Sequence, residues 1–313
     1  IDGKKGNQLV KEKNMDHSYQ PPLTERRNPR STHLDRMSSL EIATLMNEED
    51  KHVVEAVRHA LPDISKAMEL FAKKYAEGAN IFYIGAGSSG RYAILDMAEL
   101  PPTFGVDPRQ FKGLMAGGPE AMYRAKENSE DDEEAARKDL EEAGMKKGDL
   151  LIGLAASGQT PYVLSGMKKA KEEGALTISI SCVEEDKIGE YADIPIRLLC
   201  GPEILTGSTR LKAGTAEKMV LNMISTGAFV LCGKVYENLM VDLIPSNSKL
   251  VKRETRIVQE ATGADEEEAE KALRECSRSA KEAIVMIKLG CDAESAKLAL
   301  KKAGGFVRKA IKE

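Results

Sequence analysis

The sequence predicts an α/β fold, a doubly wound and mainly parallel sheet flanked by helices, with a small C-terminal all-helical domain. Two segments, 81–99 and 150–174, carry the first part of this prediction, because each reads as a buried strand, a turn rich in small polar residues and a helix. Other strand patterns alternate with helical ones, which is typical of parallel sheets. From about residue 252 the chain changes to helices of Glu, Ala and Lys, which predicts the helical domain.

The first unit starts with four apolar or aromatic residues, 81–84, followed by Gly85-Ala86-Gly87-Ser88-Ser89-Gly90-Arg91. We expect a strand, a tight turn and a helix from Tyr92. Glycine brings no Cβ, so the N–H groups of the turn and the positive end of the helix can converge on one anion. The hydroxyls of Ser88 and Ser89 make a phosphate or a carboxylate the expected ligand.

The same stretch formally matches G-x-G-x-x-G, the fingerprint of dinucleotide sites. That fingerprint needs an acidic residue about 20 positions on, at the end of the next strand. Here the position falls among Pro101, Pro102, Thr103 and Phe104. The P-loop pattern also fails, because no Lys-Ser or Lys-Thr follows the glycines. A structural turn without any ligand stays open as an alternative for this stretch alone.

The second unit repeats the first in kind. Leu150–Leu154 is an apolar strand that enters Ala155-Ala156-Ser157-Gly158-Gln159-Thr160-Pro161, and a helix is expected from Tyr162 to about Gly174. Further strands are predicted over Phe111–Ala116, Leu176–Ser181 and Ile194–Leu198. Doubly wound sheets bind ligands at the carboxyl ends of their strands, and both serine-containing turns lie at such ends.

The chain divides into four predicted parts. They are 1–22 as a disordered leader or arm, 23–78 as an N-terminal arm and helices packing on the sheet, 79–250 as the ligand-binding sheet domain, and 251–313 as the helical domain. In the second part we expect a helix capped near Ser38 and a longer one over Glu49–Glu77 with a kink or break at Pro62.

Composition excludes several classes of function. The 46 basic and 50 acidic residues give a net charge of −4, and only 4% of residues are aromatic, which argues against a nucleic acid partner. No apolar run approaches the ~20 residues of a membrane span. The five cysteines show no metal or disulfide spacing, so we expect no zinc site and reduced, mostly buried thiols in a cytoplasmic protein. They are Cys182, Cys200, Cys232, Cys276 and Cys291.

Five ordered motifs carry a family resemblance. They are Thr24-Glu25-x-Arg27-Asn28, the segment 85–91, Glu99-Leu100-Pro101-Pro102-Thr103-Phe104-Gly105, the segment 155–163, and Leu205 to Ala216. The chain from about Leu23 to the C-terminus resembles N-acetylmuramic acid 6-phosphate etherases of the sugar isomerase domain superfamily. The resemblance implies a lyase that cleaves the D-lactyl ether of the phosphosugar without a metal, a nucleotide or another cofactor. It also implies a homodimer whose site is shared between subunits.

The resemblance also implies roles for single residues. Glu99 matches the family's proton donor, and Glu130 its second catalytic glutamate; from the residues alone Glu130 cannot be chosen among its acidic neighbours in 127–134. We expect Pro101 and Pro102 to stop the helix that carries Glu99. The alternative to a catalytic role for Glu99 is a solvated glutamate at the end of a helix. The expected substrate-binding residues, hydroxyl and backbone donors above all, are Ser88, Ser89, Gly90, Ser157, Gly158, Gln159, Thr160, Thr206, Ser208 and Lys212. Lys212 reads equally well as a surface lysine.

Four positions depart from the family pattern. The family usually has Thr at Ser88, Cys at Leu100, Arg at Gln159 and Gly at Glu237. Gln159 removes a positive charge beside the expected phosphate site, and Glu237 adds a negative one. A non-catalytic phosphosugar-binding regulator and an aldose–ketose phosphosugar isomerase therefore stay open as alternatives. The histidines, all N-terminal of residue 60, are not expected to be catalytic.

Overall fold

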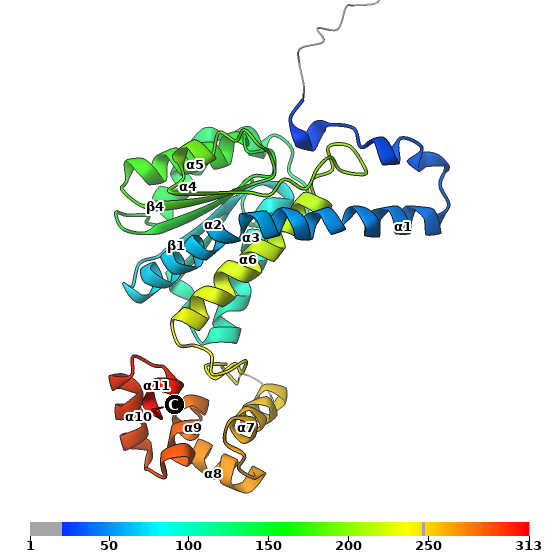
Figure 1. Ribbon diagram of the computed structural model, residues 1–313. Helices are drawn as coiled ribbons and strands as arrows, with labels where there is room; N and C mark the ends of the chain where they lie inside the picture. The colour runs from blue at the N-terminus through cyan, green and yellow to red at the C-terminus, as the bar shows by residue number, and fades with distance from the viewer. Residues whose placement is uncertain (1–20, 246–247, 313) are drawn as a thin grey trace, which may run out of the picture.

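The computed structural model describes residues 21–245 and 248–312, so the predicted leader lies outside the described residues up to position 20. Figure 1 shows a sheet covered by helices and, below it, a group of C-terminal helices. The strands are β1 (Ile81–Gly85), β2 (Phe111–Met115), β3 (Leu150–Leu154), β4 (Leu176–Ser181) and β5 (Ile194–Arg197). The helices of the sheet-containing part are α1 (Ser39–Glu49), α2 (Lys51–Ala76), α3 (Gly87–Phe104), α4 (Glu133–Glu142), α5 (Pro161–Glu172) and α6 (Lys212–Leu231).

All five strands are parallel, in the order β2-β1-β3-β4-β5, which confirms the predicted doubly wound sheet. The central strands are buried on both faces. In β1, Ile81 and Tyr83 face one core, while Phe82 and Ile84 face the other. Strands buried in this way read as continuous apolar runs, which is why the sequence identified them.

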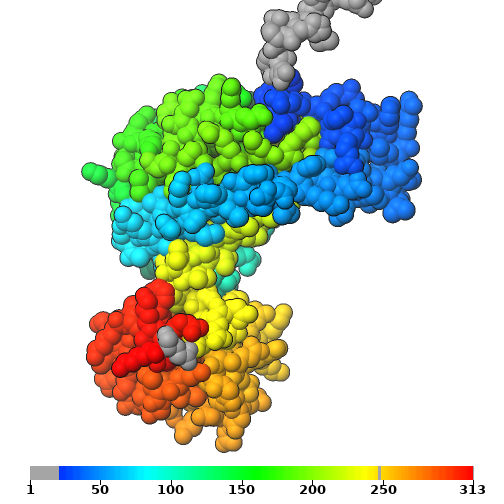
Figure 2. Space-filling view, in the orientation of Figure 1, coloured from blue at the N-terminus to red at the C-terminus, as the bar shows by residue number. Residues whose placement is uncertain are grey.

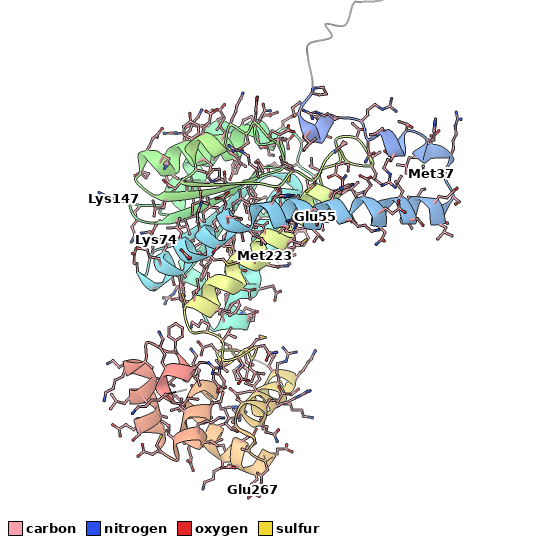
Figure 3. The ribbon with its side chains drawn as sticks, in the orientation of Figure 1. Met37, Glu55, Lys74, Lys147, Met223 and Glu267 are labelled. Atoms are coloured by element: carbon pink, nitrogen blue, oxygen red, sulfur yellow. The ribbon has the colours of Figure 1, made fainter. Side chains whose placement is uncertain are left out.

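Helices α2, α3 and α6 cover one face of the sheet, and α4 and α5 cover the other. Figure 3 marks Met223 on α6 and Glu55 on α2, the two helices that cross on this face. Aromatic rings fill the layer between helices and sheet: Phe104 stacks on Phe229 with ring centroids 4.5 Å apart, and Phe71 meets Phe229 edge-on at 5.6 Å. Such pairs add stabilisation beyond their buried area.

Helix α2 runs without a break through Pro62, so the break allowed for at this proline is wrong. Pro62 is exposed, as is Arg58, whose carbonyl loses its helical donor to the proline. Water can therefore satisfy that carbonyl. The neighbouring residues Ile64 and Ala67 are fully buried, and their packing on the sheet holds the helix together.

Helix α3 differs from the prediction at both ends. It begins at Gly87 and not at Tyr92, because the glycines and serines form its first turn and not a separate loop. It also passes through Pro101 and Pro102, which do not stop it. The helix ends at Phe104, where Gly105 adopts φ 61° and its N–H donates to the carbonyl of Pro101. A glycine in this left-handed conformation is a common end signal.

The C-terminal helices have a core of their own, which includes Val258, Leu273 and Ile284. They are α7 (Ser248–Thr262), α8 (Glu266–Glu275), α9 (Ala280–Leu289), α10 (Ala293–Lys302) and α11 (Val307–Ala310). Figure 2 shows this lobe joined to the rest through the segment that follows α6. Asp242 of that segment forms ion pairs with Lys234, at 3.1 Å, and with Lys281 of α9, at 2.7 Å.

The five cysteines are free in the structure, and Cys182, Cys200 and Cys276 are buried. Across 21–245 and 248–312, no helix has both the length and the apolar character that crossing a bilayer requires.

Candidate active site

The carboxyl ends of β1 and β3 are neighbours in the sheet, and the two serine segments that follow them line one cavity of about 370 Å³. This is the switch point at which doubly wound sheets bind ligands. The structure thus brings together five of the ten expected substrate-binding residues. The cavity is lined by Ser88, Ser89, Ser157, Gln159 and Thr160, and by Glu25, Glu130, Asp131, Gly207 and Thr209.

The first turn of α3 supplies backbone donors on one side of the cavity. Gly87, Ser88 and Ser89 lie at the start of the helix, where N–H groups have no partner within the helix. Gly90 is different, because its N–H donates to the carbonyl of Ala86 at 3.1 Å. A Cβ at Gly90 would lie 2.8 Å from the carbonyl oxygen of Gly85. Gly90 therefore lets α3 pack closely on β1 and does not offer its N–H to a ligand.

The second serine segment presents side chains more than backbone. Ser157 Oγ and Thr160 Oγ1 lie 3.4 Å apart and both line the cavity. The N–H of Gly158 was expected to bind the phosphate. It donates instead to the carbonyl of Ala155 at 2.8 Å and is not free for a ligand. Gly158 has φ 68°, and a Cβ there would lie 2.4 Å from that of Asp186. The side chain of Gln159 is exposed at the rim of the cavity.

Ser89 has a buried partner that the sequence did not reveal. Its hydroxyl oxygen is hydrogen-bonded to Glu217 Oε1 at 2.8 Å, and Glu217 is fully buried on α6. The other carboxyl oxygen, Oε2, is buried without a hydrogen-bond partner among the described residues. Burial raises the pKa of Glu217 to about 8, against the opposing effect of the Ser89 hydrogen bond. Nothing in the pattern of α6 distinguishes this carboxyl from a solvated one.

Glu130 lies between the serine cavity and a second cavity of similar volume, about 370 Å³, and is exposed to both. The second cavity is also lined by Arg91 and Lys126. Within the described residues, the charged side chains that line the serine cavity are all carboxylates, whereas the second cavity combines its two cations with the carboxylates of Glu127, Glu130 and Asp131. Arg91 Nη2 donates to the carbonyl of Ala121 at 2.7 Å. Arg91 and Lys126 were not among the substrate-binding residues that the sequence predicted.

Glu99 is exposed on α3, ten residues beyond Ser89. Ten residues of helix span about 15 Å, and Glu99 does not line the cavity. The structure of one chain therefore does not bring Glu99 to the serine segments. Leu95, one turn earlier on the same face of α3, is 46% exposed.

The third polar segment lies mostly outside the cavity. Gly207 and Thr209 line the serine cavity, whereas Thr206 lines a different hollow against the N-terminal arm. Ser208, which lies between Gly207 and Thr209 in the sequence, is half-buried. The alternative of a surface lysine at Lys212 is wrong. Lys212 is only 2% exposed, and its Nζ forms an ion pair with Glu49 Oε2 at 2.7 Å.

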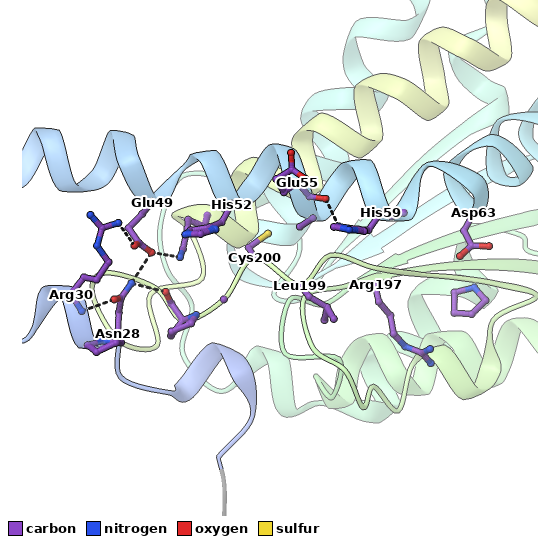
Figure 4. A pocket seen from close by; sticks show the side chains of 17 residues that line it. Asn28, Arg30, Glu49, His52, Glu55, His59, Asp63, Arg197, Leu199 and Cys200 are labelled. Carbon is purple, nitrogen blue, oxygen red and sulfur yellow. Dashed lines mark hydrogen bonds and ion pairs between the residues drawn. The ribbon is translucent and has the colours of Figure 1, made fainter.

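Lys212 belongs to a larger cavity, about 550 Å³, between α2 and the segment 195–202 (Figure 4). His52 and His59 line it from α2, and the buried pair of Glu49 and Lys212 closes one end. Its buried polar groups already have partners: Asn28 Nδ2 donates to Glu49 Oε2 at 2.7 Å. We assign the site to the smaller serine cavity, because hydroxyls and helix N-termini meet there and suit an anion.

Glu237, the other charge change relative to the family pattern, lines neither the serine cavity nor the second cavity. Glu237 has φ 53° in a turn between Tyr236 and Leu239, a conformation that favours glycine, which the family usually has at this position. Its side chain is half exposed and faces Arg308 at 3.9 Å. Glu237 therefore adds no charge to the serine cavity, and of the two charge changes only Gln159 bears on the ligand.

Comparison with known proteins agrees with the fold. The sequence matches the glucokinase regulatory protein N-terminal SIS domain over residues 63–171 and the SIS domain over 130–227. A candidate phosphosugar isomerase involved in capsule formation, from Bacteroides fragilis, superposes with a TM-score of 0.50 at 16% identity, covering 64% of this chain and 95% of that one. At that identity the likeness shows the fold alone.

Curated relatives are much closer in sequence. The chain is 49% identical to an N-acetylmuramic acid 6-phosphate etherase from Lactobacillus johnsonii, over 92% of this chain and 97% of the relative. It is 51% identical to another from Mycolicibacterium smegmatis over the same shares. The match spans both the sheet and the C-terminal helices. This chain therefore belongs to the N-acetylmuramic acid 6-phosphate etherase family, within the SIS-domain proteins.

Proposed function

We propose that this protein is a carbon–oxygen lyase that cleaves the D-lactyl ether of N-acetylmuramic acid 6-phosphate, giving N-acetylglucosamine 6-phosphate and D-lactate. The observation that carries the proposal is the 49% identity to an etherase along 97% of that relative's length. A cavity lined with hydroxyls at the switch point of the sheet supports it, because the substrate carries a phosphate.

The chemistry explains why carboxyl groups are needed. In the open-chain sugar the ether oxygen is β to the aldehyde, so loss of the proton from C2 allows the C3–O bond to break. Lactate leaves with a proton, and water then adds across the new C2–C3 double bond, with its hydroxyl going to C3 and a proton to C2. A base and an acid are required in each half, and each positioned carboxyl contributes about 10²–10⁴-fold.

Two cavities that share one wall suit a substrate with two anions. We assign the phosphate to the serine cavity, with the hydroxyls of Ser88, Ser89, Ser157 and Thr160 as donors. The lactyl carboxylate then extends into the second cavity, toward Arg91 and Lys126. In this placement Glu130, which lines both cavities, lies beside the ether between the two anions.

Glu99 is the second carboxyl of the proposal, and it reaches the substrate from a partner subunit. Within one chain its α3 position lies about 15 Å from Ser89, too far for a proton transfer. The exposed face of α3 that carries Leu95 and Glu99 supports contact with a second copy. We propose a homodimer with two shared sites. The free thiols support a reducing compartment, the cytoplasm.

The direct test supplies N-acetylmuramic acid 6-phosphate and measures D-lactate. We expect release by the wild type, and a loss of at least about 10²-fold in kcat for both Glu99→Gln and Glu130→Gln. Both variants should still bind N-acetylglucosamine 6-phosphate. A wild type that binds the phosphosugar without releasing lactate would instead support the regulator alternative, toward which the glucokinase regulatory protein match points. An isomerised sugar without lactate would support the isomerase.

A further inference from the structure

Ser89 lies between the serine cavity and a buried carboxyl that no counter-charge neutralises in the described structure. We propose that Glu217 is a positioning residue that must be protonated for Ser89 to donate its hydrogen to the substrate phosphate, so that phosphosugar binding weakens as Glu217 ionises in alkaline solution. The inference rests on the proposed function, because it concerns the phosphate of that substrate.

The argument starts from the single hydrogen of a serine hydroxyl. An ionised carboxylate only accepts hydrogen bonds, so the hydrogen of Ser89 points to Glu217 and its lone pairs face the cavity. A protonated carboxyl can donate to Ser89 Oγ, which leaves the serine hydrogen for the phosphate. The distance of 2.8 Å between Ser89 Oγ and Glu217 Oε1 suits donation in either direction.

Burial and partners favour the protonated form at neutral pH. Glu217 is fully buried, and Oε2 lacks a partner among the described residues, which is costly for a carboxylate. The two lysines of α6 are engaged elsewhere, Lys212 with Glu49 and Lys218 with Asp96.

The other elements around Glu217 also supply no compensating charge in the described structure. The thiol of Cys182, which directly follows β4, has its pKa raised by its hydrogen bond to Cys200, by burial and by Glu217 itself. Glu203 accepts the N–H groups of Lys212 and Ala213, at 3.0 and 2.9 Å, and burial raises its pKa too. Burial sets the pKa of Glu217 at about 8, so its ionisation falls just above neutral pH.

Ionisation would affect binding in two ways that act together. It reverses the donor direction of Ser89, and it places a negative charge one hydroxyl away from the phosphate in a buried setting. Both effects weaken binding, and neither applies to a glutamine at this position. The amide that Glu217→Gln introduces is neutral at every pH and has an N–H₂ group that can donate to Ser89 Oγ.

The test is calorimetric titration with N-acetylglucosamine 6-phosphate from pH 7 to pH 9.5, where the phosphate itself is already almost fully ionised. For the wild type we expect affinity to be level near pH 7 and to fall about tenfold per pH unit well above pH 8. Glu217→Gln should show a level profile over the same range. As a matched control, Glu25→Gln changes an exposed carboxyl that lines the cavity and should keep the fall seen in the wild type.

Each outcome decides the inference. A wild-type affinity that stays constant from pH 7 to pH 9.5 overturns it without any variant, even if Glu217→Gln does not fold. A fall that persists in Glu217→Gln overturns it as well, because another group must then titrate. Absence of phosphosugar binding at every pH would overturn the proposed function and this inference together, whereas binding that does not vary with pH overturns only the inference.

Discussion

Gln159 is the residue whose chemistry departs most from the family at the cavity itself. Its exposed side chain stands at the rim of a cavity whose charged lining residues, in the described structure, are Glu25, Glu130 and Asp131. We expect Gln159→Arg to bind N-acetylglucosamine 6-phosphate about two- to fivefold more tightly, since an exposed charge contributes up to about 1 kcal/mol. The gain should shrink as salt rises from about 0.05 to 0.5 M. Calorimetry measures it, and an unchanged or weaker affinity would contradict this placement of the phosphate.

Lys126 tests the other end of the proposed substrate. It is exposed and lines the second cavity, so Lys126→Gln should fold normally. We expect KM for N-acetylmuramic acid 6-phosphate to rise about two- to fivefold, with little change in the Kd of N-acetylglucosamine 6-phosphate, which lacks the lactyl carboxylate. Equal effects on both ligands would place the carboxylate elsewhere. Lys138→Gln, a change on α4 outside both cavities, is the control and should alter neither value.

Glu217 also makes a prediction about stability that needs no ligand. Burial raises its pKa in the folded protein from 4.5 to about 8, so the folded state holds a proton that the unfolded chain releases above pH 4.5. The contribution of this group is therefore complete below pH 4.5 and is lost as pH rises to about 8, at up to about 1.4 kcal/mol per pH unit. When urea denaturation is repeated across this pH range, the free energy of unfolding of Glu217→Gln should lack this part of the fall with pH. Parallel profiles for variant and wild type between pH 5 and pH 8 would show that Glu217 ionises normally.

At the scale of elements, the glycines that resembled a dinucleotide fingerprint serve two separate purposes. A Cβ at Gly90 would meet backbone atoms of Gly85 at 2.8 and 2.9 Å, whereas Gly87 has φ 54° and open space around it. We expect Gly90→Ala to lose about 3 kcal/mol or more through overpacking, and Gly87→Ala only about 1 kcal/mol through backbone strain. Urea denaturation measures both losses of stability, from the shift of each midpoint at an unchanged m value. A Gly90→Ala as mild as Gly87→Ala would mean that α3 can move away from β1.

Local patterns predicted the elements well and their ends less well. The strands were identified because apolar runs such as Ile81–Ile84 are buried on both faces. Pro101 and Pro102 were wrongly expected to end α3, since the helix passes through them and ends at Gly105. The serine hydroxyls of the site could be predicted from their place after two strands. Glu217 and Lys212 could not, because pairing between distant elements decides their burial and the sequence pattern does not record it.

At the scale of the whole molecule, the proposed homodimer can be tested through Glu99, which one chain does not bring to the serine cavity. In a two-fold symmetric dimer, each site would combine the serine segments and Glu130 of one chain with Glu99 of the other. A heterodimer of Glu99→Gln and Glu130→Gln subunits would then hold both lesions in one site and none in the other. We expect two inactive variants, mixed and allowed to exchange subunits, to recover about one quarter of wild-type lactate release, because half the dimers are mixed and each has one intact site.

Ser157→Ala mixed with Glu130→Gln is the matched control for this experiment. Both lesions fall on the residues that one chain itself gathers around the cavity, so every site in the mixed dimer keeps one lesion and activity should not return. Recovery in the first mixture and not in the second would assign Glu99 to the partner. Failure of both mixtures, with subunit exchange shown by mass spectrometry, would mean that each chain uses its own Glu99, and α3 would then have to rearrange to bring that carboxyl across about 15 Å.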